Sequence, residues 1–315
     1  MAWFLLRRLG ALILTLLLTS IVIFASMYLI PGDPAILLAG GAKATPERIA
    51  AVRVEFHLDL PPVERYLDWL GAALTGDFGR SLQYRSDVGE LLLSRLSVSI
   101  LLIIYAAILI IVGGIALGLM AALRGGTVDR MVLGFTSAAV ATPSFVAAVL
   151  MIAVFAVGLR WFPASGLGEG FFDRLWHLTM PAIVLSSVYI ALIARVSRTN
   201  FLASMRADHV TVARSRGVRE SVVVRRHIVR NGLGPVLTLS GIIIAGLLVG
   251  ATIAETAFGL NGVGALLRQS VIFQDLPVVQ AISLLVVAAF LVCNTAVDIA
   301  YRYLDPRIAD AEAKA

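Results

Sequence analysis

The sequence predicts an all-α integral membrane protein with six transmembrane helices. Of its 315 residues, 59% are hydrophobic and 15% are charged, whereas about a quarter of the residues in a soluble domain are charged. The mean hydropathy is +0.91. The charged residues are also clustered, so that long stretches contain no Asp, Glu, Lys or Arg. Together these observations exclude an ordinary soluble domain.

Six of the charge-free stretches are long enough to cross a bilayer. They are residues 9–32, 96–123, 131–159, 175–194, 231–254 and 276–297. A helix needs about 20 apolar residues to cross ~30 Å of hydrocarbon, and the next longest stretch has only 12 residues. Several stretches are apolar on every side, unlike the alternating strands of a membrane β-barrel. The first stretch exceeds the roughly 7–15 apolar residues of a signal peptide, so we expect it to remain as an anchor helix.

The distribution of arginine predicts which side of the membrane each loop faces. With both termini cytoplasmic, the two ends and the two inner loops hold 16 of the 26 basic residues, and the short outer loops hold three. Short cytoplasmic loops are enriched in Lys and Arg. We therefore predict that both termini are cytoplasmic. The net charge of +6 then anchors the chain at the inner leaflet and requires no nucleic acid.

The long external segment 33–95 is expected to contain two short helices. Thr45-Pro46-Glu47 is typical of a helix start, with a capping hydroxyl, a proline in the first turn and an acidic residue at the positive end. Val63–Leu74 can form the second helix, and Gly76-Asp77-Phe78-Gly79 is predicted to form a turn.

Glycine and proline predict local features of the spans. Gly114-x-x-x-Gly118 and Gly246-x-x-x-Gly250 favour close approach between helix backbones. Pro143 is expected to interrupt the third span and Pro181 to begin the fourth.

The segment between the fourth and fifth spans, residues 195–231, is strongly basic. It has nine basic and two acidic residues, a net charge of +7. We expect a helix over 200–216, a left-handed Gly217 that ends it, and a second helix over 220–230. Two short helices hinged at a glycine would form a rigid lever beneath the membrane.

This segment resembles the cytoplasmic loop of binding-protein-dependent ABC importer permeases of the dipeptide, oligopeptide and nickel branch. The resemblance begins with Thr211-Val212-Ala213-Arg214-Ser215-Arg216-Gly217, followed by His227-Ile228-Val229-Arg230-Asn231 and Pro235. It covers most of the chain and includes Leu29-Ile30-Pro31-Gly32-Asp33-Pro34, Gly76-Asp77-Phe78-Gly79-Arg80-Ser81, Trp161-Phe162-Pro163-Ala164-Ser165-Gly166, Glu255-Thr256-Ala257-Phe258, Gly262-Val263-Gly264, Asp275-Leu276-Pro277-Val278-Val279-Gln280 and Leu304-Asp305-Pro306-Arg307. The chain departs from the usual family pattern at Thr211-Val212 and at Gly234. It also has Asn261 at a position where many relatives have proline.

The resemblance implies the type I ABC importer transmembrane fold, in three parts. Residues 1–94 would form the first transmembrane helix and the external helical segment. Residues 95–304 would form the importer transmembrane domain, with the coupling loop around 195–231. Residues 305–315 would form a cytoplasmic tail.

The resemblance also implies functional residues and partners. The helix over 209–219 would dock in a cleft of an ATPase subunit, and the residues expected to take part are Thr211, Ala213, Arg214, Arg216, Gly217 and Arg219. Glu255 and Asn261 are candidates for an outer gate, although Glu255 could also be an ordinary interfacial carboxylate. The expected partners are a second related permease, two ATPase subunits, an extracytoplasmic binding protein and the lipid bilayer.

The chain itself is predicted to have no catalytic, cofactor or metal site. A Walker A loop requires a lysine between a glycine and Ser or Thr, and neither Lys43 nor Lys314 has that context. ATP and Mg²⁺ are therefore assigned to the partner ATPase subunits. The four histidines are scattered along the sequence, and Cys293 is the only cysteine, so we expect neither a metal cluster nor an intrachain disulfide.

The predicted function is that of a permease subunit, not an enzyme, in a peptide importer of the bacterial inner membrane. Nickel or a metal chelate is the alternative substrate, because His227-Ile228-Val229-Arg230-Asn231 and Val292-Cys293-Asn294 are similar to nickel permeases. A proton-coupled secondary transporter is a third candidate, but such proteins often carry intramembrane carboxylates, and the six stretches carry no charge. The sequence shows no nucleophile motif or selectivity filter, which disfavours an intramembrane enzyme or a channel.

Overall fold

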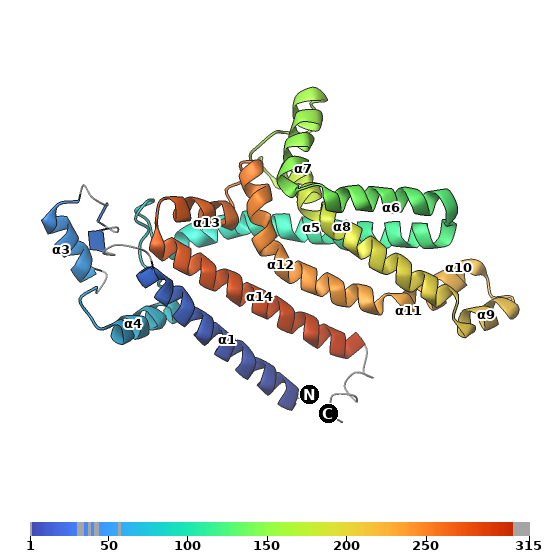
Figure 1. Ribbon diagram of the computed structural model, residues 1–315, viewed down its shortest axis with the longest axis horizontal. Coiled ribbons are helices and arrows are strands. Elements are labelled where there is room, and N and C mark those ends of the chain that lie inside the picture. Colours follow the sequence, from blue (N-terminus) through green and yellow to red (C-terminus); the bar gives the residue numbers. More distant parts are fainter. Residues whose placement is uncertain (1, 30–34, 37–38, 41–43, 56–57, 305–315) are drawn as a thin grey trace. The chain divides into compact units, whose positions relative to one another are not determined.

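The structure, a computed structural model, describes residues 2–29, 35–36, 39–40, 44–55 and 58–304 and is almost entirely helical (Figure 1). In lipid, a helix satisfies the backbone polar groups of a segment within that segment. The only β-bridge in this described part is an isolated antiparallel one between Arg80 and Asp87. The chain divides into a first unit, Met1–Val98 with Asn261–Val292, and a second unit, Ser99–Leu260 with Cys293–Ala315.

Five helices in the described ranges are long and apolar enough to span a membrane. They are α1 (Ala2–Leu29), α5 (Val88–Arg124), α8 (Phe171–Met205), α12 (Gly234–Ala257) and α14 (Leu276–Leu304). The stretch predicted as the third span is divided between α6 (Gly126–Ala141) and α7 (Ser144–Met151), which continues into the π-helix η2 (Ile152–Gly158). The two parts are bent by 105°. The described part of the chain thus has five candidate spans, or six if the bent pair counts as one, and the number six stays a prediction.

The two prolines behave differently. Pro143 lies at the bend, where Thr142 is extended with a ψ of 117°, as expected for the residue before a proline. The predicted interruption at Pro143 is therefore confirmed. The prediction that Pro181 begins a span is wrong, because α8 already starts at Phe171 and Pro181 is buried inside it. The start is set by Gly170, with a φ of 78°, and by an acidic residue in the first turn.

In the first unit, two short helices follow α1, as the sequence predicts. α3 (Pro46–Glu55) begins behind Thr45, whose hydroxyl accepts a 3.3 Å hydrogen bond from Arg48 N. α4 (Pro62–Thr75) ends at Gly76, which has a φ of 85°. The predicted turn after α4 is also confirmed, since Gly79 N donates a 2.9 Å hydrogen bond to Asp77 Oδ1.

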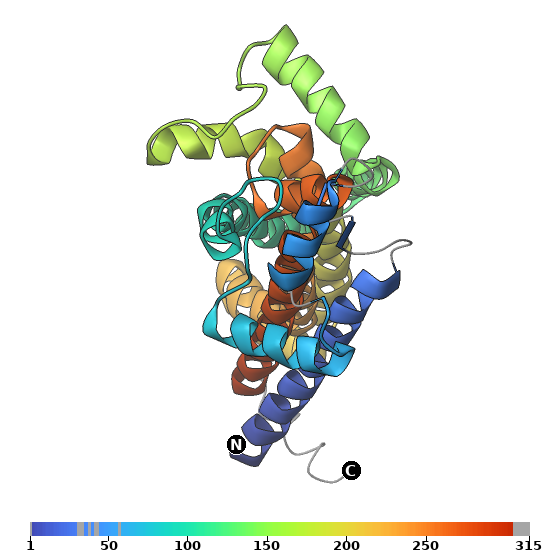
Figure 2. The same ribbon diagram turned by 90° about the vertical axis from the view of Figure 1, so that its left-hand side faces the viewer.

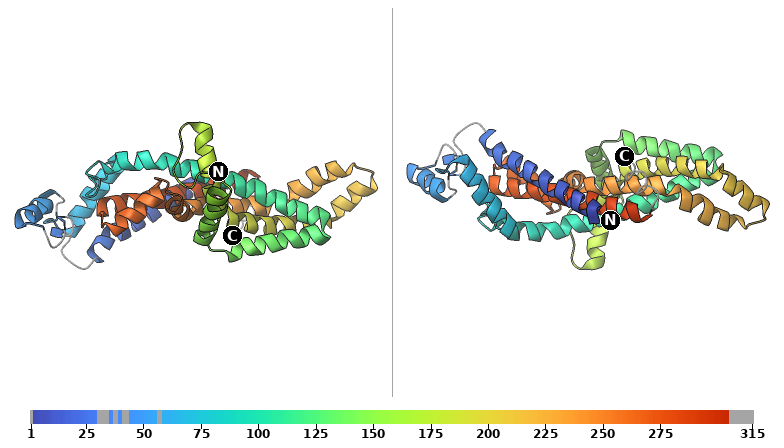
Figure 3. Two further views of the ribbon diagram at one scale, coloured as in Figure 1. Left: turned by 90° about the horizontal axis from the view of Figure 1, so that it is seen from above. Right: turned by 90° about the horizontal axis from the view of Figure 1, so that it is seen from below.

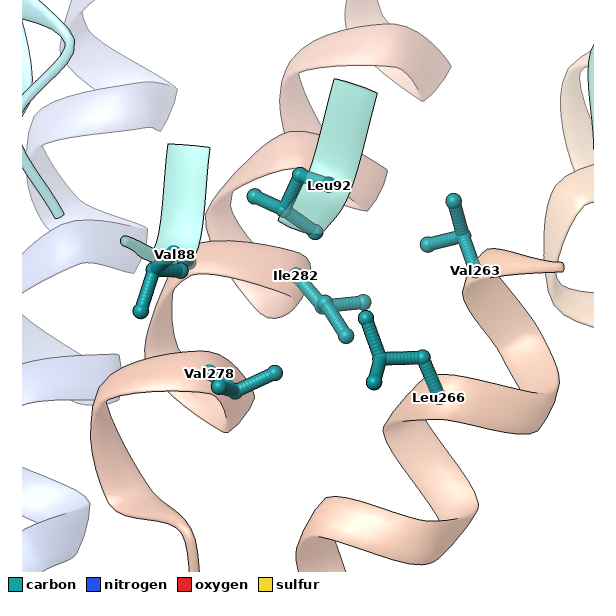
Figure 4. Close-up of a cluster of buried hydrophobic side chains, with 7 residues drawn as sticks. Val88, Leu92, Val263, Leu266, Val278 and Ile282 are labelled. Atoms are coloured by element: carbon teal, nitrogen blue, oxygen red, sulfur yellow. The ribbon is translucent and has the colours of Figure 1, made fainter. Parts of the chain in front are cut away.

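The core of the first unit joins the beginning of α5 to α13 (Val263–Ile272) and to the beginning of α14. The buried cluster consists of Val88, Leu92, Val263, Leu266, Val278, Ala281 and Ile282, most of which are labelled in Figure 4. Its members come from two segments of the chain that are separated in sequence by residues Ser99–Leu260 of the second unit. Burial of apolar side chains therefore holds the N-terminal and C-terminal parts of this unit together.

In the second unit, α8 packs closely against α5. The helix α6 runs beside α8 (Figure 3). A Cβ atom added at Gly118 of α5 would lie 2.5 Å from Ser197 Cβ, so the predicted close approach at the first glycine pair is confirmed. At the second pair, a Cβ at Gly250 would lie 3.3 Å from a Leu185 methyl, and one at Gly246 would meet nothing within 4 Å. Arg198 of α8 also forms a bidentate ion pair with Asp129 of α6, with Nη2 2.6 Å from Oδ2.

Candidate functional site

The strongly basic segment folds into a helical hairpin at the end of α8 (Figure 3). We call residues 206–232 the elbow. Its first arm is α9 (Asp208–Ser215), and its second arm consists of α10 (Glu220–Val222), the π-helix η3 (Val223–Val229) and α11 (Arg230–Gly232). The expected second helix over 220–230 is confirmed, with π-helical geometry in its middle.

The prediction of one continuous helix over 200–216 is wrong, because the helix breaks at Arg206 and Ala207. The amides of these two residues bond to the carbonyls of Ala203 and Ser204, three residues back, and Ala207 is extended with a ψ of 146°. The change of direction lets α9 bury Val210 in a cluster with Phe201 of α8. Burial of the α9 side chains thus overrides continuation of α8.

α9 has a buried face and an exposed face. Val210 is fully buried and Ala213 is 7% exposed, and both pack in a cluster with Phe201, Val223 and Ile228. The exposed positions of α9 include Thr211, Val212, Arg214 and Ser215. The apolar face therefore fixes α9 to the second arm and to α8, while the other face is available to a partner.

Gly217 closes the first arm with a Schellman motif, the paired hydrogen bonds that end many helices. Gly217 N donates to Arg214 O at 2.9 Å, and Val218 N donates to Ala213 O at 3.1 Å. The φ of Gly217 is +72°, as predicted from the sequence. A Cβ there would meet nothing within 4 Å, so the requirement for glycine comes from the backbone conformation and not from lack of space.

Two polar contacts join the arms of the elbow. At the tip, Arg214 forms a bidentate pair with Glu220, with Nη2 2.6 Å from Oε1 and Nε 3.2 Å from Oε2. These hydrogen bonds lower the pKa of Glu220 and raise that of Arg214. At the base, Asn231 Nδ2 donates to the carbonyl of His227 at 2.8 Å and lies 3.1 Å from His209 Nε2.

The second arm also packs tightly against the end of α8. A Cβ at Gly232 would lie 2.6 Å from Phe201 Cδ1 and 3.3 Å from Ser204 Oγ. Gly232 therefore lets the backbone of the second arm approach α8 closely. Together with the cluster around Val210, this contact makes α8 and the elbow one packed body.

The structure brings the six predicted coupling residues into the elbow, but their surroundings differ. Thr211, Arg216 and Arg219 are exposed, Gly217 forms the turn, and Arg214 pairs with Glu220 within the same chain. Ala213 faces the interior, where it packs in the cluster with Phe201 and Val223. The sequence reasoning missed Glu220, although an acidic residue shortly after the glycine turn of a basic segment is a visible signal.

The candidate gate residues lie in different units. Glu255, near the end of α12, is fully buried, and its Oε1 accepts a 2.6 Å hydrogen bond from Ser99 of α5. The structure thus places it in the interior of the second unit. Asn261 belongs to the first unit and is exposed. Their role in a gate stays a prediction.

In the described ranges, no three His, Cys, Asp or Glu side chains gather in a way that could hold a metal ion. Cys293 is a free thiol in α14.

Two family models match successive parts of the chain. Residues 1–103 match the N-terminal part of binding-protein-dependent transport system membrane components, and residues 114–310 match the binding-protein-dependent transport system inner membrane component. The chain is 39% identical over 308 residues to a protein of Brucella abortus (strain 2308) provisionally named a peptide transport system permease, covering 96% of this chain and 98% of that one. It is 34% identical over 306 residues to the glutathione transport system permease protein GsiC of Escherichia coli (strain K12), covering 97% and 98%.

Solved structures show a similar fold. An inward-facing structure of the MetNI methionine ABC transporter has a TM-score of 0.53 at 17% identity, covering 68% of this chain and 96% of that chain. A crystal structure of an amino acid ABC transporter with histidines has a TM-score of 0.50 at 16% identity, covering 68% and 94%. At these identities the likeness concerns the fold alone.

Proposed function

Because the chain belongs to the family of binding-protein-dependent transport system inner membrane components, we propose that it is the permease subunit of an ABC importer for peptides. It is a multi-pass protein of the bacterial inner membrane. Relatives named for peptide and for glutathione transport support the substrate class, since glutathione is itself a small peptide. These names favour peptides over nickel or a metal chelate, and family membership disfavours a proton-coupled carrier.

The proposal includes partners and an orientation. A second related permease would complete the pathway, two ATPase subunits would bind ATP and Mg²⁺, and an extracytoplasmic binding protein would deliver the peptide. The arginine distribution supports cytoplasmic termini and a cytoplasmic elbow. The bent pair α6 and α7–η2 would then count as one of six spans.

The single observation that carries the mechanism is the two-faced construction of α9. Its inner face is packed on α8 through Val210 and Phe201, and α8 is long and apolar enough to span the membrane. A displacement of the exposed face by a partner would therefore be passed directly to a spanning helix, because packed interiors transmit strain. This supports a role for Thr211 and its exposed neighbours as the contact surface for an ATPase subunit.

Cross-linking tests the proposed contact. In a Cys293→Ser background, Thr211→Cys should cross-link to the ATPase subunit in the assembled complex, and the neighbouring buried position, Val210→Cys, is the matched control. Peptide uptake into vesicles should require the ATPase subunits and ATP. The proposal fails if this chain alone moves peptide into vesicles, or if Thr211→Cys cross-links no better than the buried control.

A further inference from the structure

The short helix α4 has three distinct faces. Successive residues of a helix turn by about 100°, so Val63, Leu67 and Leu74 fall on one stripe, and Glu64 and Asp68 fall on the next. The apolar stripe is well exposed, with relative exposures of 70%, 58% and 81% for its three residues. The acidic residues are exposed as well. Large apolar side chains that are exposed along one stripe of a helix indicate that lipid or another protein covers this stripe.

α4 lies against α1, as Figure 2 shows, and its third face makes the contact. The Phe24 ring of α1 lies 5.5 Å from that of Tyr66 and 5.7 Å from that of Trp69, measured between centroids. The hydroxyls of Ser20 and Tyr66 are 2.8 Å apart. Buried Arg65 lies over the Phe24 ring, with Cζ 5.8 Å from its centroid. These contacts fix both the position of α4 along α1 and its rotation.

That position places α4 at the boundary of the bilayer. The apolar helix α1 extends to Leu29. Phe24 lies five residues before that end, which at 1.5 Å per residue is about 8 Å, and Ser20, which the Tyr66 hydroxyl reaches, lies about 14 Å before it. A helix that packs its rings on Phe24 therefore lies near the depth of about 5–10 Å to which amphipathic helices insert their apolar face.

We propose that α4 is an interfacial helix whose stripe of Val63, Leu67 and Leu74 inserts into the phospholipid bilayer around the far end of α1. Leu18, Ile21 and Val22 of α1 are also exposed, in the same half of the span as the contact with α4. Tyr66 and Trp69 are the residue types enriched at membrane interfaces. The inference depends on the proposed function in one respect only: cytoplasmic termini place α4 at the outer leaflet.

The acidic face sets the kind of lipid contact. Glu64 and Asp68 give this face a negative charge, so attraction to anionic headgroups does not hold α4 in place. Insertion of the apolar stripe supplies the binding, and α4 should therefore remain inserted in zwitterionic lipid and at high salt.

Site-directed spin labelling tests the inference on the whole chain in lipid nanodiscs. In a Cys293→Ser background, labels are placed at Leu67→Cys and Val63→Cys on the stripe and at Asp68→Cys on the acidic face as the matched control. Power saturation then compares collisions with oxygen, which concentrates in lipid, and with a water-soluble nickel chelate. We expect stripe labels to be accessible to oxygen and protected from the chelate, the reverse at Asp68→Cys, and no change between phosphatidylcholine alone and its mixture with phosphatidylglycerol.

Three outcomes would overturn the proposal. The stripe labels could be as accessible to the chelate as Asp68→Cys, which would mean that water covers the stripe. They could be inaccessible to both reagents and cross-link to a second permease or to the binding protein, which would mean that protein covers it. Oxygen access that appears only with phosphatidylglycerol would mean that headgroup charge holds α4. Leu74→Cys provides the same measurement if Leu67→Cys fails to insert.

The measurement is independent of transport. A parallel uptake assay of the labelled complex reports on the proposed importer function, and loss of uptake with normal oxygen access would leave the lipid contact intact. Conversely, normal uptake with a water-exposed stripe would contradict only the lipid contact.

Discussion

Ser81 and Asp275 are 194 positions apart in the sequence, yet Ser81 Oγ donates a 2.5 Å hydrogen bond to Asp275 Oδ2 in the interior of the first unit. Asp275 is fully buried, and its carboxylate also accepts the amides of Leu82 at 3.3 Å and Gln83 at 3.2 Å. Ser81 Oγ in turn accepts the amide of Tyr84 at 2.9 Å. One carboxylate thus organises the loop before α5 and ties it to the turn between α13 and α14.

This arrangement predicts a large effect of removing the carboxylate. Asp275→Ala would leave a hydroxyl and two backbone amides without their acceptor, and each buried donor so left costs about 1–3 kcal/mol. We expect the free energy of unfolding to fall by about 3 kcal/mol, visible as a lower thermal unfolding temperature of the chain in detergent. Asp275→Asn keeps one carbonyl acceptor and should lose less.

Asp59, which is exposed in the same unit, provides the control. Asp59→Ala should unfold at the temperature of the unmodified chain. If Asp275→Ala did the same, the carboxylate would not hold the loop.

Gly217 gives a prediction about coupling. A side chain at its φ of +72° is strained, by about 1–2 kcal/mol in the left-handed region. Gly217→Val should therefore open the Schellman turn and rotate the exposed face of α9. We expect several-fold less peptide taken up per ATP hydrolysed by the reconstituted complex, with ATP hydrolysis retained.

Gly234→Ala is the matched control, because Gly234 lies at the start of α12 and a Cβ there meets nothing within 4 Å. It should transport as the unmodified chain does. Equal uptake per ATP in Gly217→Val would contradict the role of the turn.

The pair Arg214 and Glu220 permits a charge-exchange experiment. Both side chains are largely exposed, and such pairs add little to stability, so their main effect is to orient α9 against the second arm. Arg214→Glu and Glu220→Arg should each reduce uptake, because each places like charges together. The double exchange should restore uptake, measured in the same reconstituted complex. Failure of the double exchange would indicate that Arg214 acts on a partner subunit and not on Glu220.

The same pair has a predictable pH dependence. The hydrogen bonds from Arg214 lower the pKa of Glu220. The pair therefore holds α9 against the second arm at every pH above the ordinary Glu pKa of about 4.3. It is lost as the pH falls through the lowered value. A spin label at Thr211→Cys should therefore keep its neutral-pH spectrum down to the ordinary Glu pKa of about 4.3, and the spectrum should change only as the pH falls through the lowered pKa of Glu220. In Glu220→Gln the spectrum should show the same small increase in mobility already at neutral pH, because the burial of Val210 still holds α9.

The features that the sequence predicts well are those decided by neighbouring residues. Candidate spans can be located from runs of uncharged residues, because each run must be long enough to cross a hydrocarbon layer of fixed thickness. The Gly217 turn follows from the backbone preference of one residue. The break at Arg206 has no such local signal, since no glycine or proline marks it, and the burial of Val210 against Phe201 decides it. The bond between Ser81 and Asp275 is equally invisible before the chain folds, because it depends on contacts across the whole sequence.

The two Gly-x-x-x-Gly motifs make the same point and give the last prediction. At Gly118 an added Cβ would lie 2.5 Å from Ser197 Cβ and 2.6 Å from the carbonyl of Ala194, so even alanine must push α5 away from α8. At Gly246 it would meet nothing within 4 Å. Overpacking of a packed interface costs about 1–3 kcal/mol, so Gly118→Ala should lower the thermal unfolding temperature in detergent. Gly246→Ala should leave it unchanged or raise it, because alanine favours the helix. Equal effects at the two positions would mean that the motif and not the contact with α8 determines the requirement for glycine.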